Sequence, residues 1–336
     1  MGISEIDTPP RTGAPEAAAT PSRKRLLRYL FLLLLIPAIF YPFPFLIATS
    51  ASYEHWSTSQ WGPMLEYAYN TQPQNADVVI FGDSTAFIGV DPRILNEKLG
   101  IRSLVLPDTV GSIPVTGDLP LRTYLAHNRP PRLLVLYFSA WNLDFGHIAK
   151  FRLFEGEEML LRHGSRGEIA SFTLHHPTEL LVFPFRLYST FGPKMIAAAL
   201  HHVNREKTTA EALGHADFTG AFPPLKSSCV IPAEYLSDAG SQSVQALVRR
   251  YTTPETHVVV YIAPVPGCRN SDEVTSRSFS TLGVPPPKAL PAPDFAGDAY
   301  YAHVLPAFVG ASTLQLANRL QGILPLESSR VPTTNP

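Results

Sequence analysis

A stretch of about nineteen residues without a charged side chain runs from Tyr29 to Ile47. This length approaches the roughly 20 residues that an α-helix needs to cross a bilayer. Four basic residues precede the stretch, and the first charged residue after it is Glu54. The four are Arg23, Lys24, Arg25 and Arg28. Because basic residues favour the cytoplasmic side, we expect a single-pass anchor over 23–50 with the body outside a bacterial-type inner membrane, in the periplasm.

Two alternatives to an anchor, a cleaved signal peptide and an ordinary core helix, remain open. Three prolines (Pro37, Pro42 and Pro44) weaken the second half of the stretch as a helix, and that half could instead lie at the membrane interface. A cleaved signal peptide would have small residues near Ala48–Ala51 at its cleavage site, although its apolar core would usually be shorter. An ordinary core helix does not explain four basic residues at one end. The anchor and the signal peptide both predict an exported body.

The composition excludes several classes of protein. With 336 residues, the chain has room for about two domains. It is 45% hydrophobic and 16% charged, too apolar for a disordered chain and too poor in charge for a coiled coil. A net charge of −1 gives no general electrostatic case for a nucleic-acid partner. Two cysteines are too few for a cysteine-rich zinc module.

Beyond the anchor, apolar runs typical of strands alternate with segments typical of helices. The expected strands are Asp77–Phe81, Ser103–Leu106, Arg132–Phe138 and His257–Ala263. The expected helices between and after them are Pro92–Leu99, Leu119–His127, Ser241–Tyr251 and Leu305–Leu320. This alternation predicts an α/β fold with a parallel sheet and helices on both faces.

The pattern also predicts how the chain is divided. We expect a disordered cytoplasmic tail over 1–22, a lead-in over 51–75, an α/β domain over 76–326 and a disordered tail over 327–336. A helical cap is expected to interrupt the domain at about 151–228. Its expected helices are Glu155–Arg162, Pro177–Leu187 and Pro193–Val203.

The apolar side chains of the cap are expected to pack in an ordinary core. An acyl pocket and contact with the bilayer are the alternatives for them. These side chains are Leu160, Leu161, Phe172, Leu180, Leu181 and Phe183.

The first expected strand runs directly into Gly82, Asp83 and Ser84. Gly82 permits a tight turn, which would expose the serine hydroxyl at the carboxyl end of the strand. The amide groups after the turn could then face a developing oxyanion. The alternative is a serine that only caps a helix after a strand.

Four short blocks resemble the SGNH (GDSL-like) hydrolases, over roughly residues 75–325. Gly82-Asp83-Ser84 matches the first block, Gly111 the second, Asn142 the third, and His303 with Pro306 and Gly310 the fourth. The resemblance implies a flavodoxin-like three-layer sandwich. It also implies that Ser84 is the nucleophile and His303 the general base. The Ser84 amide, the Gly111 amide and the Asn142 side chain would form the oxyanion hole.

Two blocks depart from the pattern of the family. The third normally reads Gly-x-Asn-Asp, whereas this chain has Ala140-Trp141-Asn142-Leu143. The acid normally lies three residues before the histidine, where this chain has Tyr300. Asp298 lies five residues ahead of the histidine and Asp294 nine. Three arrangements remain open. The acid of a triad could be Asp298 or Asp294, or the site could work as a Ser–His pair without an acid.

The resemblance implies a membrane-anchored serine esterase or O-acyltransferase that acts on acyl esters of cell-envelope or exopolysaccharide glycans. Some exported proteins of this type act beside a multi-spanning membrane acyltransferase, which is the expected protein partner. We expect no cofactor and no metal, because neighbouring histidines such as His175-His176 and His201-His202 point in different directions on a helix.

Two other functions are weighed against this enzyme. The first is a catalytically weak scaffold of the same fold that binds a glycan or a partner, suggested by the departures in the third and fourth blocks. The second, a phosphate-binding domain, has little support because no glycine-rich phosphate loop occurs. In an exported domain, Cys229 and Cys268 are expected to form a disulfide, with two free thiols as the alternative.

Overall fold

A computed structural model describes residues 23–49, 61–146, 154–200, 209–216, 219–237, 240–298 and 300–323. The expected tails 1–22 and 327–336, residues 51–60 of the lead-in and the pair His201-His202 lie outside the described residues. The chain divides into two compact units, Met1–Phe43 and Pro44–Pro336, and each is described by itself.

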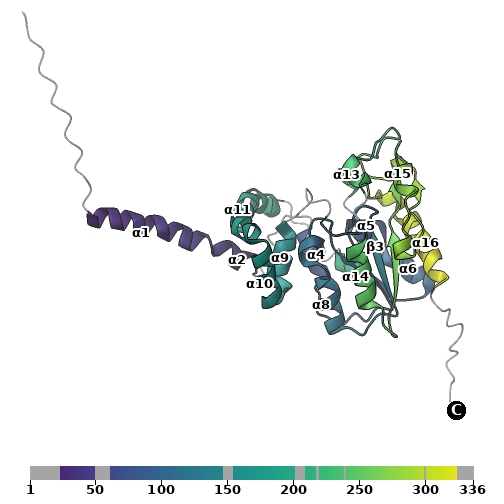
Figure 1. Ribbon diagram of the computed structural model, residues 1–336, viewed down its shortest axis with the longest axis horizontal. Coiled ribbons are helices and arrows are strands. Elements are labelled where there is room, and N and C mark those ends of the chain that lie inside the picture. Colours follow the sequence, from purple (N-terminus) through teal and green to yellow (C-terminus); the bar gives the residue numbers. More distant parts are fainter. Residues whose placement is uncertain are drawn as a thin grey trace, which may run out of the picture. The chain divides into compact units, whose positions relative to one another are not determined.

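The described part of the first unit is dominated by the helix α1 (Arg23–Phe40), which contains Pro37. A short helix, α2 (Phe43–Ala48), follows it in the chain. The stretch Arg23–Ala48 is the one described segment long and apolar enough to cross a membrane, with a mean hydropathy of 2.4. An anchor and an export signal share these properties. Large apolar side chains of α1, such as Leu27, Phe31 and Leu34, are exposed. Figure 1 shows α1 as one long helix.

The second unit is built on a four-stranded sheet. Its strands are β1 (Val78–Gly82), β2 (Ser103–Pro107), β3 (Leu133–Phe138) and β4 (His257–Ile262). All neighbouring pairs are parallel, and the strand order is β2-β1-β3-β4. Every residue of the first three strands is buried, which explains why the sequence shows continuous apolar runs rather than alternation. The predicted α/β fold with a parallel sheet is confirmed.

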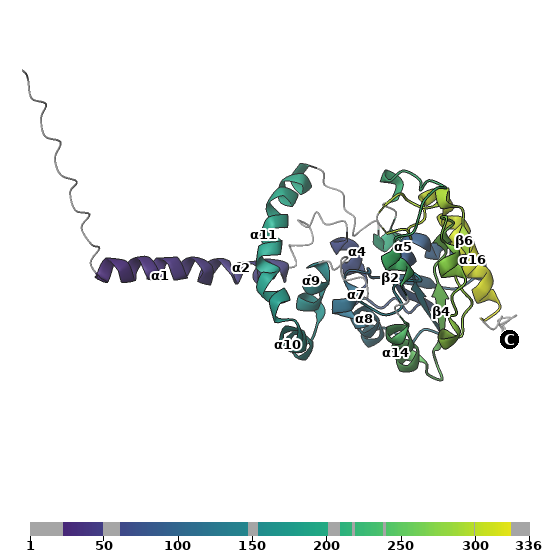
Figure 2. The same cartoon turned by 45° about the horizontal axis from the view of Figure 1, so that its top comes forward.

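Helices cover the two faces of this sheet (Figures 1 and 2). On one side lie α8 (Leu119–His127) and α14 (Gln242–Tyr251), and on the other lie α6 (Pro92–Leu99) and α16 (Pro306–Gln321). The bounds of α6 follow from its caps. Asp91 accepts the amide of Arg93 at the N-terminus, and Gly100 ends the helix in a left-handed conformation, with φ 64°.

Several short elements complete the fold. The helices are α4 (Gly62–Tyr67), α5 (Ser84–Gly89), α7 (Ile113–Thr116), α13 (Ala233–Leu236) and α15 (Asp272–Thr275). The 3₁₀ turns are Thr219–Ala221, Ser280–Leu282 and Ala292–Asp294. Two short strands, β5 (Val265–Pro266) and β6 (Ala289–Leu290), pair with each other in a separate two-stranded parallel sheet.

Among its described residues, the expected insertion contains the helices α9 (Phe154–His163), α10 (Arg166–His175) and α11 (Pro177–Leu200). Helix α9 packs against α7 and α4, which lie near the carboxyl end of β2. A capping box between Ser165 and Glu168 starts α10. Helix α11 is continuous where two helices were predicted with a break before Pro193. A proline removes one backbone hydrogen bond from a helix but does not always end it.

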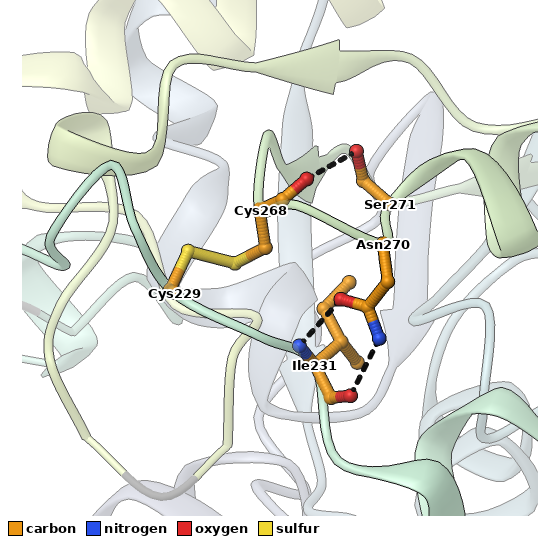
Figure 3. Close-up of a disulfide and its surroundings, with 5 residues drawn as sticks. All are labelled: Cys229, Ile231, Cys268, Asn270 and Ser271. Atoms are coloured by element: carbon orange, nitrogen blue, oxygen red, sulfur yellow. Dashed lines mark hydrogen bonds between the residues drawn. A yellow bond between two sulfur atoms is a disulfide. The ribbon is translucent and has the colours of Figure 1, made fainter.

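A disulfide joins Cys229 to Cys268, as predicted (Figure 3). It links the end of the insertion to the loop that follows β5. The Asn270 side chain bonds both the amide and the carbonyl of Ile231, at 2.8 and 2.9 Å, so the same two segments are also joined by hydrogen bonds. Together with the apolar N-terminal helix, the disulfide indicates an exported or anchored protein.

Candidate active site

The turn after β1 depends on the absence of a side chain at Gly82. A Cβ atom built there would lie 1.6 Å from the carbonyl oxygen of Tyr137 on β3. Only glycine therefore allows β1 and β3 to approach this closely where β1 ends. The next two residues, Asp83 and Ser84, leave the sheet at its carboxyl edge, where open α/β folds place their sites.

Asp83 is the N-cap of α5, which begins at Ser84. The Asp83 carboxylate accepts hydrogen bonds from both the amide and the hydroxyl of Thr85, at 3.0 and 2.5 Å. This cap fixes the backbone on either side of Ser84. The Ser84 side chain is held within a buried turn, and the residue is 4% exposed.

Ser84 is hydrogen-bonded to His303, which follows it by 219 residues in the chain. The distance from Ser84 Oγ to His303 Nε2 is 2.7 Å. The other ring nitrogen of His303, Nδ1, lies 2.6 Å from Asp298 Oδ2. The imidazole is fully buried and the Asp298 side chain is 3% exposed. The structure therefore joins Asp298, His303 and Ser84 in one chain of hydrogen bonds shielded from bulk water.

The path of the loop before α16 explains how Asp298 reaches the histidine. Residues Phe295 and Val304 form an antiparallel bridge, and the Ala296 amide donates to the His303 carbonyl at 2.8 Å. The segment 295–304 thus folds back on itself as a hairpin, with Asp298 near its tip. Asp298 Oδ1 also accepts the amide of Tyr300 at 2.9 Å, which orients the carboxylate. Asp294 lies before the hairpin, and its carbonyl accepts the amide of Leu305.

Aromatic rings pack around the histidine. The Tyr300 ring lies 4.9 Å from the His303 ring, and Trp61 packs edge-on against both Tyr300 and Phe87. Burial raises the pKa of the Tyr300 hydroxyl, and the nearby Asp298 carboxylate adds to this effect. These rings keep water from the polar chain. Sequence analysis did not identify Trp61 or Tyr300 as part of the site, because their contacts join segments far apart in the chain.

Asn142 lies just beyond β3, within reach of the turn after β1. Its side-chain nitrogen donates to Asp83 Oδ2 at 3.0 Å, and the amide and hydroxyl of Ser139 donate to the same oxygen. A carboxamide nitrogen carries two hydrogens, and Asp83 accepts one of them. That the other faces an oxyanion stays a prediction. The residue is 1% exposed. Sequence analysis identified Asn142 but missed Asp83 and Ser139, which orient it.

Gly111 lies in a buried turn between β2 and α7. Hydrogen bonds among its neighbours hold this turn. Asp108 accepts from the Thr109 amide and the Thr116 hydroxyl, at 2.7 and 2.9 Å, and the hydroxyls of Thr109 and Ser112 are 2.6 Å apart. Burial raises the pKa of Asp108 to about 7, although the hydrogen bonds that it accepts act against this shift. That the Gly111 amide faces an oxyanion stays a prediction.

No protein-family model and no curated protein matches this chain. Across the described ranges, no group of three His, Cys, Asp or Glu side chains is placed to hold a metal ion. A serine hydroxyl, a histidine and a carboxylate in this order are the groups needed to deprotonate an oxygen nucleophile.

Proposed function

We propose that this protein is a membrane-anchored serine esterase or O-acyltransferase of the SGNH type. The observation that carries the proposal is the hydrogen-bonded series Asp298–His303–Ser84, with distances of 2.6 and 2.7 Å. In this reading the fold is a flavodoxin-like sandwich with a helical cap, and α1 is the anchor. The disulfide supports an oxidising location outside the cytoplasm.

In the proposed reaction, Ser84 Oγ attacks the carbonyl carbon of an acyl ester while its proton moves to His303 Nε2. The carbonyl oxygen becomes an oxyanion that accepts hydrogen bonds from the Ser84 amide, the Gly111 amide and the Asn142 side chain. The intermediate collapses as His303 returns the proton to the leaving alcohol. This leaves an acyl group on Ser84.

A second half-reaction transfers the acyl group from Ser84 to an acceptor and restores the free serine. His303 takes a proton from the acceptor hydroxyl, which attacks the acyl-serine and displaces Ser84 Oγ, and the proton returns to that oxygen. Water as the acceptor gives an esterase, and a sugar hydroxyl gives a transferase. In both steps Asp298 holds the Nδ1–H tautomer and stabilises the positively charged imidazolium.

The proposed substrates are acyl esters of cell-envelope or exopolysaccharide glycans, and the proposed partner is a multi-spanning membrane acyltransferase. The support for both is the resemblance of the four sequence blocks to exported proteins of this kind, together with the N-terminal apolar helix. A catalytically weak scaffold that binds a glycan or a partner is the alternative. It is favoured by the sequence of the third block, where Leu143 replaces the usual aspartate.

A fluorophosphonate probe tests the proposal, because it reacts with an activated serine and not with ordinary ones. The full-length protein in detergent is treated with the probe and its intact mass is measured, beside Ser84→Ala and Ser276→Ala. Ser276, an exposed serine at the end of α15, serves as the control. We expect one adduct in the wild type and in Ser276→Ala, and none in Ser84→Ala. A folded wild-type protein without an adduct supports the scaffold.

A further inference from the structure

Helix α11 has two different apolar faces. Phe183, Pro184 and Leu187 are buried and face the rest of the domain. On the outward side, Leu181 is 57% and Phe185 69% exposed. These two positions are four residues apart, so their side chains lie together on one side of the helix. Single exposed apolar residues are common in soluble proteins, but a stripe of large ones indicates an interaction surface.

Nearby positions extend this surface. Val182 is 38% exposed, and Leu174, close to the end of the preceding helix α10, is 80% exposed. We define the outward surface of the insertion as Leu174, Leu181, Val182 and Phe185. The apolar residues of the cap therefore differ in burial. Leu160, Phe172 and Phe183 are buried in the core as expected, whereas Leu181 is exposed.

The charged residue next to these positions on α11 does not interrupt the surface. Between Leu180 and Ser189 the only charged residue is Arg186. Its guanidinium group pairs with Glu157 on α9 at 2.9 Å and with Glu179 at 2.6 Å. The positive charge is therefore engaged by carboxylates of the domain and is kept off the outward stripe.

The chain itself connects this surface to the apolar N-terminal segment. Within the second unit, the Phe45 ring of α2 packs on the Phe183 ring of α11, with 5.3 Å between centroids. Pro44 and Ala48 of α2 are buried, while Leu46 is 67% exposed. Only a few residues separate α2 from the end of α1 at Phe40. Helix α2 therefore follows the proposed anchor closely in the chain, and its Phe45 ring packs on α11.

We propose that the outward surface of the insertion lies in the interfacial layer of the same bilayer that holds α1. Leu174, Leu181, Val182 and Phe185 insert among the acyl chains, and α11 lies along the membrane surface. Apolar helices that lie in this layer bury their large side chains at the boundary between headgroups and acyl chains. A second contact with the bilayer fixes the orientation of the catalytic domain, which a single flexible anchor does not. The inference rests on the proposed anchor.

Spin labels on the full-length protein test this proposal. Single cysteines replace Leu181 or Phe185 on the surface, Leu33 in α1, and Leu314 as a control, and each is labelled with a nitroxide. Leu314 is also an exposed leucine on a helix, at 41%, but α16 lies at the end of the domain away from α11 (Figure 2). The natural cysteines are joined in a disulfide and do not react with the label. The labelled proteins are placed in phosphatidylcholine nanodiscs, and collisions with oxygen and with a water-soluble nickel complex are measured.

We expect labels at 181 and 185 to gain collisions with oxygen and lose collisions with nickel, relative to the label at 314. The label at 33 should show the deepest position. If the label at 33 is buried in lipid while those at 181 and 185 collide with nickel as often as the label at 314, the surface lies in water and the inference is wrong. Low collision rates with both reagents at 181 and 185 mean that protein covers the surface, which also overturns it. If the label at 33 is itself accessible to nickel, the proposed anchor fails first.

Discussion

Asp83 and Asn142 are joined by a hydrogen bond of 3.0 Å that links the carboxyl ends of β1 and β3. Asp83 also caps the helix that starts at Ser84. One carboxylate therefore sets the position of the proposed nucleophile and of a proposed oxyanion donor together. The Asp83 carboxylate itself does not contact Ser84 Oγ in the hydrogen-bond network, so its role is to position other groups.

Replacing Asn142 with alanine should remove one oxyanion donor. We expect kcat for an activated acetyl ester to fall by about 10²- to 10³-fold, because such a donor contributes about 3–4 kcal/mol in the transition state. KM should change little, since the donor acts on charge that develops during the reaction. Steady-state kinetics on the purified full-length protein measure both constants. An unchanged kcat would remove Asn142 from the oxyanion hole.

Replacing Asp298 with asparagine should leave the fold intact and disturb the His303 tautomer. We expect kcat to fall by about 10³- to 10⁴-fold, as for loss of the buried carboxylate of other triads. Asp294→Asn is the matched control, because Asp294 is the other acid on the segment before the histidine and makes no hydrogen bond to it among the described contacts. If kcat falls in Asp294→Asn and is unchanged in Asp298→Asn, the assignment of Asp298 as the acid of the triad is wrong. Equal and normal rates for both indicate a Ser–His pair.

The sequence was sufficient to predict the sheet and to place several candidate site residues at its edge, for a physical reason. Strands β1 to β3 are buried along their whole length, so they appear as apolar runs, and they are followed by Asp83, Asp108 and Ser139. The residues that follow parallel strands lie at the same edge of the sheet, whatever conformation the connecting loops adopt. Ser84 and Asn142 could therefore be placed together without knowledge of side-chain positions.

The contact between Asp298 and His303 could not be predicted in the same way. It depends on the hairpin over 295–304, which is held by backbone bonds and by packing of Phe295 in the core. The roles of Asp83 and Trp61 likewise arise from contacts across long sequence separations. For α11, the sequence predicted two helices, Pro177–Leu187 and Pro193–Val203, where the structure has one helix over Pro177–Leu200.

Replacing Gly82 with alanine should destabilise the protein by at least about 3 kcal/mol, because the new methyl group meets the Tyr137 carbonyl and backbone cannot move aside cheaply. Gly89→Ala, seven positions later at the end of α5, is a matched control. A Cβ there meets its nearest atoms at 3.7 Å, an ordinary contact. Thermal unfolding followed by circular dichroism should show a large drop in Tm for Gly82→Ala only. Similar Tm values for both variants would mean that β1 and β3 can separate at this point.

The high pKa of Asp108 predicts a dependence of stability on pH. Its pKa is about 7 in the folded protein because of burial, and an aspartate in an unfolded chain has a pKa of about 4. Between these values the folded state binds a proton that the unfolded state has lost, so the free energy of unfolding decreases as pH rises from about 4 to about 7. The full effect is on the order of 4 kcal/mol, or 1.4 kcal/mol for each pKa unit.

Asp108→Asn isolates this effect, since asparagine keeps an oxygen acceptor but does not titrate. Urea unfolding of wild type and variant is compared between pH 5 and pH 8. We expect the wild type to lose more stability than Asp108→Asn over this interval, and the exposed Asp272→Asn to behave as the wild type. Identical slopes for wild type and Asp108→Asn would show that Asp108 remains ionised throughout.

The disulfide between Cys229 and Cys268 closes a loop across 39 positions of sequence. On the chain-entropy estimate, losing this cross-link destabilises the protein by about 4 kcal/mol, because the unfolded chain gains conformational freedom. We expect the double variant Cys229→Ser/Cys268→Ser to unfold at a clearly lower urea concentration than the wild type. A thiol reductant should lower the stability of the wild type but not that of the double variant. Asn270→Ala is the informative comparison: it removes the paired hydrogen bonds to Ile231 but leaves the bridge. If the double serine variant is no less stable than Asn270→Ala, the hydrogen bonds rather than the disulfide hold these two segments together.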